Sequence, residues 1–526
     1  MIRPQFPFDA LARSVAEVGG LPVDIAGCVV LLEVVGVTQQ QARALGCADL
    51  FELAAEVRPR VAAYVTPSKV TRRSPRVERV RFGGLFYNSN WIVMVAAVLI
   101  GGQSLWVAPN SPPEVTTALT MAVMSAFVST GGIQQFATMR MTYYRQQGNR
   151  PLERFVMSRA VLLGIVAVLV SVAVVSLAAV SVIGLPRESV VIVAIYGSLV
   201  GVARLLAIPQ LVRKSFAEML FVSLVALGVM FGLYRYLEPL TDRTSAVLLS
   251  QVAGLAVLCV VGVALVARYF RRSAGRATGP DDPPFYARAD APRQVRAPRL
   301  WSLVAAGTPQ LLYGTMFFVF LYTDRILSWA RSADGAYILA YNYRYQLGVD
   351  LALLTLVPIT VAKYPMITKL IDEFLRLAYE TSIADGARIP KLIQRLIATI
   401  LVRITVVSAI LCAVAFAAAT PLVGFAGGDE EIARAFRYGV IGVFFFAVFL
   451  ANSAIAMNFN WTMDMAVLLV VASCCDLLVG AIAVSRFGLN ASVAGFIAGS
   501  LFLAAASTYM LVSRKSALVF AFYAAR

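Results

Sequence analysis

Long runs of apolar residues, separated by short polar breaks, make up most of the chain after residue 82. Each run is long enough to cross a membrane, because about 20 residues of α-helix span the ~30 Å hydrocarbon core of a bilayer. The pattern therefore predicts an all-α polytopic membrane protein with about 12 transmembrane helices. We expect these helices at 87–107, 115–137, 157–184, 189–209, 216–236, 245–267, 300–323, 337–362, 396–424, 436–457, 463–485 and 488–512.

The first 82 residues have a different pattern. Thr38 is followed three residues later by Gln41, and Asp49 by Glu52, with a glycine between the two pairs. This is the spacing of two capping boxes separated by a helix stop. We therefore expect a small helical cytoplasmic domain, joined to the first span by a basic linker that would lie against anionic lipid headgroups.

The twelve spans fall into two groups of six. The polar break between the groups is rich in Arg, Pro and Ala, which is typical of a flexible linker. Two pseudo-symmetric six-helix bundles are a transporter layout, in which the substrate path lies between the halves. The expected domains are a cytoplasmic domain with its linker, a first bundle, a cytoplasmic linker, and a second bundle with a short tail: 1–82, 83–268, 269–299 and 300–526.

Composition agrees with a membrane protein, and charge adds an orientation. Hydrophobic residues make up 59% of the chain and charged residues 14%, with a formal net charge of +17. The basic residues are concentrated in alternate loops, including eight Arg within 268–299 and six Lys or Arg within 363–395. By the positive-inside rule these loops are cytoplasmic, so both termini are cytoplasmic as well. The same rule accounts for the excess of positive charge without a nucleic-acid partner.

Residue usage argues against metal, disulfide and most catalytic chemistry. The chain has no His, which is the commonest general base and metal ligand. Its six Cys show no CxxC spacing and are typical of small buried residues. The N-terminal stretch lacks the apolar segment of a cleavable signal peptide. We therefore expect no metal, no cofactor and no catalytic site.

Ionisable side chains inside membrane helices are candidates for function, because each costs roughly 2.5–3.5 kcal/mol on insertion scales. Asp350 either takes up a proton or contacts a sugar in a cavity, or it pairs with a basic residue on a neighbouring helix. For Asp476 the competing interpretation is a helix–helix hydrogen bond, and for Arg403 it is a side chain that extends to the inner interface. The transport-cavity candidates are Asp350, Arg344, Asp476, Arg403 and Arg204.

An adjacent acid and base, Asp324 and Arg325, follow the seventh apolar run in "FLYTDRILSW". The run has used its ~30 Å by Tyr322, so we expect the pair at the outer interface. Adjacent residues do not face each other on a helix, so each needs another partner, such as Ser328 for Asp324 and another helix for Arg325. One interpretation is an interfacial anchor with Tyr322 and Trp329 in the aromatic belt. The other is an outer gate between the halves.

Gly307 and Pro309 lie in the same seventh helix. Proline removes a backbone hydrogen bond and its ring clashes with the preceding turn, so the pair predicts a kink. Such a kink would let the halves rock against each other, and these two residues are the hinge candidates.

Two stretches resemble a known family. "DGAYILAYNYRYQLGVDLALLTLVPITVAKYPMI" (334–367) resembles the eighth helix of the multidrug/oligosaccharidyl-lipid/polysaccharide (MOP) flippases, with its Tyr-x-x-Ala-Tyr-like start and closing Pro. The stretch 115–152 is similar to the equivalent second helix. Within that superfamily, "FLYTDRILSW" and the loop "LIDEFLRLAYETSIADGARIPKLIQRLIATIL" resemble the Pel-type exopolysaccharide exporters.

The resemblance implies a flippase in the cell (inner) membrane that exports a polysaccharide or a lipid-linked oligosaccharide by alternating access between its two bundles. An ion or proton gradient would drive it, with Asp350 as the titrating group. The implied partners are the sugar substrate and the membrane. From the capped helices of residues 1–82 and their position before the first span, we also expect this domain to dock a cytoplasmic glycosyltransferase or assembly protein.

The alternatives are a cation-coupled multidrug antiporter of the same superfamily and a permease subunit that needs a separate ATPase. A membrane glycosyltransferase or polymerase is disfavoured because the outer loops are short.

Overall fold

The computed structural model describes residues 6–19, 22, 25–64, 112–146, 149–213, 215–274, 300–329, 339–380, 389–425 and 428–514. Within these ranges every regular element is helical, and eleven segments are long and apolar enough to cross a membrane. All eleven coincide with predicted spans, so the expected class, an all-α polytopic membrane protein, is confirmed. The predicted span 87–107 lies outside the described residues, and the number twelve stays a prediction.

The first half of the described membrane region contains helices α7 to α12. Helix α8 ends in one π-helical turn at Ala179–Ile183, and α9 continues after a short break into α10. Their bounds are α7 (Pro113–Gln146), α8 (Arg150–Ala178), α9 (Arg187–Leu206), α10 (Ile208–Arg213), α11 (Phe216–Leu237) and α12 (Arg243–Ala274).

The second half contains α13 to α20. The predicted eighth span is two consecutive helices that meet at Thr355, and the second of them runs well beyond the expected end at residue 362. The bounds are α13 (Leu300–Trp329), α14 (Tyr343–Leu354), α15 (Leu356–Glu380), α16 (Ile389–Ala417), α17 (Ala419–Phe425), α18 (Glu430–Asn458), α19 (Thr462–Phe487) and α20 (Val493–Ser513).

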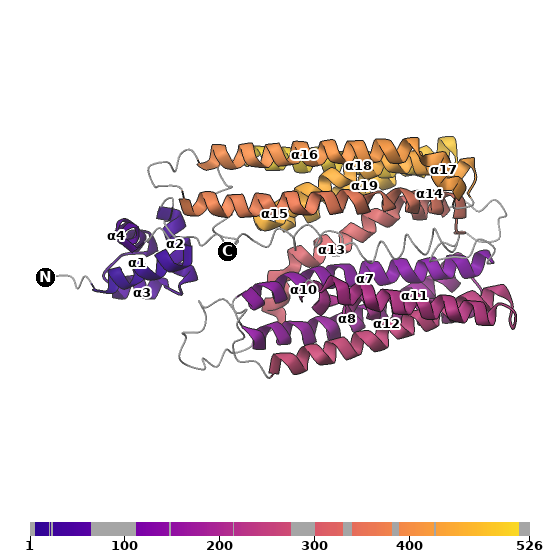
Figure 1. Ribbon diagram of the computed structural model, residues 1–526, viewed down its shortest axis with the longest axis horizontal. Coiled ribbons are helices and arrows are strands. Elements are labelled where there is room, and N and C mark those ends of the chain that lie inside the picture. Colours follow the sequence, from indigo (N-terminus) through magenta and orange to yellow (C-terminus); the bar gives the residue numbers. More distant parts are fainter. Residues whose placement is uncertain are drawn as a thin grey trace.

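Helices α1 (Phe6–Gly19), α2 (Ile25–Val34), α3 (Gln39–Ala44) and α4 (Leu50–Tyr64) pack around a small core of their own. They lie beside the end of the membrane bundle at which α13 begins (Figure 1). We call this end the near end and the opposite one the far end. The basic linker predicted between residues 65 and 82 lies outside the described residues.

The local signals in this region form largely as predicted. Thr38 and Gln41 make a complete capping box at the start of α3. Gly46 has φ of +84°, a left-handed conformation that glycine adopts without strain and that ends the helix. The second box differs in one bond. Asp49 accepts from the Glu52 N–H as expected, but the Glu52 carboxylate accepts from the backbone N–H of Ala48 rather than of Asp49.

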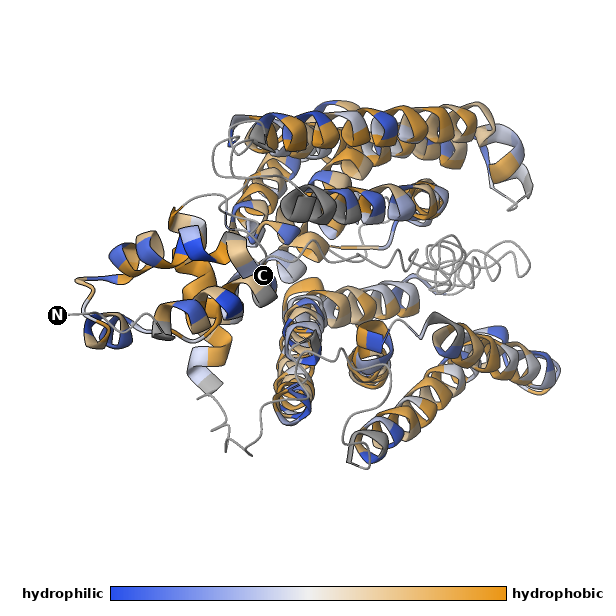
Figure 2. Ribbon diagram, turned by 60° about the vertical axis from the view of Figure 1, so that its left-hand side comes forward, coloured by the Kyte–Doolittle hydropathy of each residue, from blue (hydrophilic) through white to orange (hydrophobic). Residues whose placement is uncertain are grey.

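The outer faces of the membrane helices carry apolar side chains that no part of the described chain covers. Leu177 and Val260 are each 70% exposed, and Leu478 is 64% exposed. The hydropathy colouring shows the apolar character of these faces along both groups of helices (Figure 2). A surface of this kind would aggregate in water and is stable against lipid tails, which is the expected environment of a membrane span.

Helix α13 crosses from one half to the other (Figure 1). Near its beginning Leu303 belongs to the core of the first half, together with Met141 and Val156. Further along, Phe320 belongs to the core of the second half, with Phe446 and Phe496. One helix therefore contributes to both cores.

Glycines allow α13 to approach α7 closely. A Cβ on Gly314 would overlap the Gly131 carbonyl group, and a Cβ on Gly132 would overlap the carbonyl of Leu311. Such contacts between backbones are typical of membrane helices, where association depends on close packing because lipid tails are as apolar as the side chains. The α7–α13 crossing is thus a tight contact between the two halves.

Candidate functional site

The pair at the end of α13 is buried, contrary to the expected exposure at the outer interface. Arg325 is 5% exposed, and its Nη2 lies 2.7 Å from Oδ1 of Asp350 on α14. Asp350 is a quarter exposed and also accepts from the Gln346 side chain, at 3.2 and 3.3 Å. Arg325 therefore takes its partner from another helix, as predicted. Of the two interpretations of Asp350, the structure forms the ion pair.

Asp324 points to a different partner. Its Oδ2 accepts a hydrogen bond of 2.5 Å from the hydroxyl of Tyr345, and the side chain is 1% exposed. The proposed bond with Ser328 is wrong, because that hydroxyl donates to the carbonyl of Arg325. Trp329, expected in the aromatic belt, is buried as well, at 2% exposure. Asp324 and Trp329 are buried because α14 and α19 cover the end of α13.

Asp476 on α19 is fully buried and interacts electrostatically with Asp324. Neither of its carboxylate oxygens has a hydrogen-bond partner among the described residues. Its interaction with a neighbouring helix is the one with Asp324 of α13, and the helix–helix hydrogen bond stays a prediction. Gly495 and Gly499 of α20 lie against it, and a Cβ on Gly495 would overlap an Asp476 carboxylate oxygen. Two carboxyl groups, Asp350 and Asp324, thus interact with the Arg325 guanidinium, and Asp476 interacts in turn with Asp324.

Arg204 lies in the first half, on α9. Its Nε donates to the Thr130 hydroxyl at 2.9 Å, and its Nη2 donates to the Gln134 side chain at 3.0 Å. The guanidinium carbon is 3.8 Å from the ring centre of Phe127 and 4.9 Å from that of Phe318. Phe318 belongs to α13, so this inward-facing arginine also contacts the other half.

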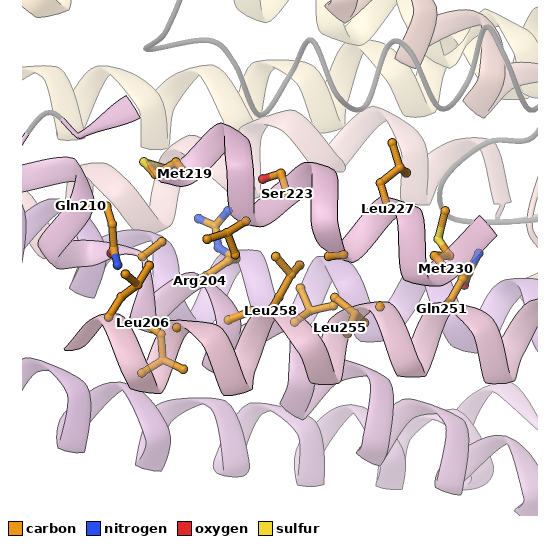
Figure 3. A pocket seen from close by; sticks show the side chains of 18 of the residues that line it. Arg204, Leu206, Gln210, Met219, Ser223, Leu227, Met230, Gln251, Leu255 and Leu258 are labelled. Atoms are coloured by element: carbon orange, nitrogen blue, oxygen red, sulfur yellow. The ribbon is translucent and has the colours of Figure 1, made fainter. Parts of the chain in front are cut away.

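A cavity of about 360 Å³ opens next to Arg204, between α7, α9, α10, α11 and α12 (Figure 3). Most of its lining side chains are apolar. The polar groups are few: Gln134, Tyr196, Arg204, Gln210, Ser223 and Gln251. No acidic residue is found among the described residues that line it. Arg204 was the one sequence signal for this cavity, because the rest of its walls come from five helices whose residues are mostly apolar.

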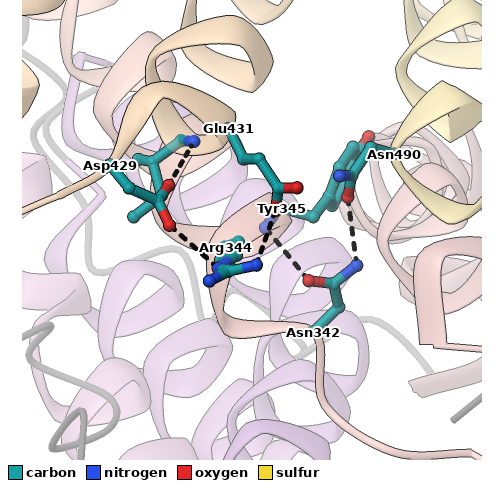
Figure 4. Close-up of polar contacts among 7 residues, drawn as sticks. Asn342, Arg344, Tyr345, Asp429, Glu431 and Asn490 are labelled. Atoms are coloured by element: carbon teal, nitrogen blue, oxygen red, sulfur yellow. Dashed lines mark hydrogen bonds and ion pairs between the residues drawn. The ribbon is translucent and has the colours of Figure 1, made fainter. Parts of the chain in front are cut away.

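Two cavity candidates lie elsewhere. Arg344 is 57% exposed at the far end, where it pairs with Asp429 at 2.9 Å and Glu431 at 2.8 Å (Figure 4). Both acids stand at the start of α18, and Arg344 therefore joins two helix ends rather than lining a cavity. Arg403 is on the exposed face of α16, between exposed Val402 and Val406, and points away from the bundle interior.

The hinge candidates occupy the place where α13 passes between the two cores. Helix α13 continues through Gly307 and Pro309 without interruption. A Cβ on Gly307 would overlap the ring of Phe136 on α7, so the glycine is required by close packing. Bending at this position stays a prediction.

Several residues of these clusters were not singled out from the sequence: Tyr345, Gln346, Phe127, Thr130, Gln134 and Phe318. Tyr345 had a detectable signal, because it lies in the polar run "YNYRYQ" at the start of an otherwise apolar span. The others are ordinary residues whose role depends on which helices become neighbours.

The sequence profile of the PelG exopolysaccharide exporter (EPS-E) family matches residues 76–523. The chain belongs to this family. The protein is therefore a membrane transporter of the exporter class, and the match begins just before the membrane region. No curated protein sequence matches it significantly.

Solved structures with a similar fold are MATE transporters. A MATE in complex with MaL6 has a TM-score of 0.57 at 13% identity, covering 84% of this chain and 97% of the other. The eukaryotic MATE transporter AtDTX14 has a TM-score of 0.56 at 12% identity, with coverage of 87% and 99%. The Vibrio cholerae MATE transporter VcmN in its bent form has a TM-score of 0.52 at 12% identity, with coverage of 84% and 97%. At these identities the similarity concerns the fold.

Proposed function

We propose that this PelG-family transporter exports a polysaccharide, or a lipid-linked oligosaccharide, across the cytoplasmic membrane by alternating access between its two halves, and that it is not an enzyme. The observation that carries the proposal is α13, which is built into the cores of both halves. A helix shared in this way would connect the two faces of a path between the halves, and PelG-family membership makes a polysaccharide the expected cargo of that path.

The motion follows from the packing of α13. Its beginning lies in the core of the first half through Leu303, and its end is held in the second half by the Arg325–Asp350 ion pair. Pro309 lies between these two attachments and lacks the N–H of a regular helical hydrogen bond. Bending there would let the second half rotate together with the later part of α13 while Leu303 stays in the core of the first half.

We assign the near end to the cytoplasm. Most of the basic residues lie at this end, including Arg140 and Arg145 in the last turns of α7 and Arg150, Arg154 and Arg159 in the first turns of α8. Both termini would then be cytoplasmic by the positive-inside rule. Helices α1–α4 would face the cytoplasm and dock a glycosyltransferase or another assembly protein. Normal export by a chain that lacks residues 1–64 would contradict this docking role.

A multidrug antiporter is the second candidate. It is favoured by the MATE-like fold and by Asp476, a fully buried carboxyl group without a hydrogen-bond partner in the described residues. Such a group is better suited than Asp350 to exchange a proton with substrate or solvent, because Asp350 is already paired with Arg325.

The test is complementation of a deletion strain with wild type, Asp476→Asn, Asp350→Asn or Asp324→Asn. Cell-surface polysaccharide, sensitivity to a panel of drugs, and the amount of protein in the membrane are measured together. Loss of polysaccharide without a change in drug sensitivity supports the exporter. Intact polysaccharide with new drug sensitivity supports the antiporter and contradicts our proposal.

A further inference from the structure

The cavity beside Arg204 is separate from the charged cluster of the second half and has a different chemical character. Its walls are mainly leucine, valine, alanine and methionine side chains, with a single cation at one place. A polysaccharide needs many hydrogen-bonding partners, and this cavity offers few. Its volume of about 360 Å³ falls in the usual range for a small-molecule site, which is roughly 300–1,000 Å³.

The cation has no acidic partner. Among the described residues, no carboxylate lies within ion-pair distance of Arg204, and its guanidinium donates hydrogen bonds to the neutral side chains of Thr130 and Gln134. Arg204 is partly buried, and charges that are withdrawn from water in proteins are usually paired, because removing an ion from water is costly. The rings of Phe127 and Phe318 offset part of that cost. An anion from outside the chain would supply the missing counter-charge.

The cavity is elongated. Along α12 its lining residues run from Gln251 to Leu265, which is about 21 Å at 1.5 Å per residue. On α11 they repeat at helical spacing from Met219 to Met230, so both helices present an apolar face to the same space. The guanidinium of Arg204 therefore lies beside an elongated apolar channel, and the length of this channel is that of a hydrocarbon chain.

We propose that this cavity binds an anionic amphiphile with one hydrocarbon chain, whose phosphate or carboxylate pairs with Arg204 while the chain lies between α11 and α12. An apolar cavity of this kind does not hold water well, and a chain would fill it. The guanidinium presents a fork of donors that suits a phosphate or carboxylate. The proposal concerns a binding site and does not depend on the identity of the exported sugar.

The experiment measures binding to the purified full-length protein in neutral lipid nanodiscs by native mass spectrometry and by thermal stabilisation. The probes are dodecyl phosphate, dodecanol, and inorganic phosphate. We expect dodecyl phosphate to bind at least tenfold more tightly than either of the others, because only it supplies both charge and chain. The proposal would be overturned if dodecanol bound as tightly as dodecyl phosphate. It would also be overturned if inorganic phosphate did so, because the ligand would then be a free anion.

Variants separate a binding role from a structural one. Arg204→Gln is expected to lower the affinity for dodecyl phosphate at least tenfold, and Arg204→Lys is expected to retain part of it. Arg403→Gln is the matched control, since that arginine is also within a membrane helix but lies on the exposed face of α16.

If Arg204→Gln does not fold, Ala226→Leu provides an independent test. Ala226 lines the cavity and is 5% exposed, so the larger side chain would fill the channel and leave Arg204 in place. We expect dodecyl phosphate binding to fall while inorganic phosphate binding stays unchanged. Unaltered dodecyl phosphate binding in this variant would contradict the position assigned to the chain.

Discussion

Removing the charge of Arg325 tests whether the pair at the end of α13 holds the second half together. The guanidinium is 5% exposed and 2.7 Å from Asp350. Breaking a buried ion pair by removing one partner costs about 3–5 kcal/mol, because the other charge is left without compensation. Asp350 is a quarter exposed and keeps its hydrogen bonds from Gln346, and both features lower the cost of removing Arg325. Asp324, next to Arg325 in the chain, is almost fully buried, and this raises the cost again.

We therefore expect Arg325→Gln to lower the free energy of unfolding by about 3 kcal/mol. Asp350→Asn should cost less, about 2 kcal/mol, because Arg325 retains the neighbouring charge of Asp324. The double variant should cost about 3 kcal/mol rather than the sum of the two, which gives a coupling energy of about 2 kcal/mol.

The measurement is unfolding of the purified protein by a denaturing detergent in mixed micelles, for the two single variants and the double. Arg344→Gln is the control, since this arginine is 57% exposed and a surface pair contributes about 0–1 kcal/mol. Two outcomes would refute the reasoning. One is an additive double variant, which means that the two charges do not interact. The other is an Arg344→Gln effect as large as that of Arg325→Gln.

Three further predictions concern packing, chemistry and motion. Gly314→Ala should lower the unfolding free energy by about 2 kcal/mol, since overpacking costs roughly 1–3 kcal/mol, whereas Gly228→Ala, with open space around it, should have little effect in the same unfolding assay. Burial raises the pKa of Cys28 from 9.0 to about 11, so its thiolate at pH 8 is about a hundredfold scarcer than that of an ordinary thiol. Alkylation followed by mass spectrometry should be slow until the chain is unfolded or the pH approaches 11, and fast labelling at pH 8 would contradict the buried position. Pro309→Ala should reduce polysaccharide export at normal protein levels, and Pro365→Ala, a proline within another helix, should not.

The sequence predicts most of the fold because membrane spans follow a simple rule. A run of about 20 apolar residues is stable only in a bilayer or in a large protein core. Each such run therefore predicts one membrane helix at its own position in the chain. Boundaries were less accurate. The eighth span was expected to end at 362, but α15 continues to Glu380, since Lys363 and later charged residues extend a helix that has already left the apolar run.

The site was predicted in part, and the errors have one cause. The distance of a residue from the start of its helix can be counted from the sequence. This count correctly placed Asp324 and Arg325 near the end of α13. Whether that end is covered depends on which other helices pack there, and α14 and α19 cover it. The surroundings of Arg344 and Arg403 could not be decided for the same reason: helical spacing gives the face of a residue on its own helix, but not whether that face meets the bundle or the lipid.

Arg325, which is buried, and Arg204, which is partly buried, would respond differently to a rotation of the halves. Arg325 lies 5.6 Å from the ring centre of Tyr322, and both residues are on α13, so this contact moves as a unit. Arg204 belongs to α9 but reaches Phe318 of α13 at 4.9 Å. Rocking of the far part of α13 would therefore separate Arg204 from Phe318 and leave the Arg325 contact intact. A cation–π contact is worth about 0.5–2 kcal/mol, and its loss would strengthen the need of Arg204 for an external anion. If the proposed ligand and the proposed rotation both hold, occupancy of the first-half cavity and the state of the transporter would be linked through this one arginine.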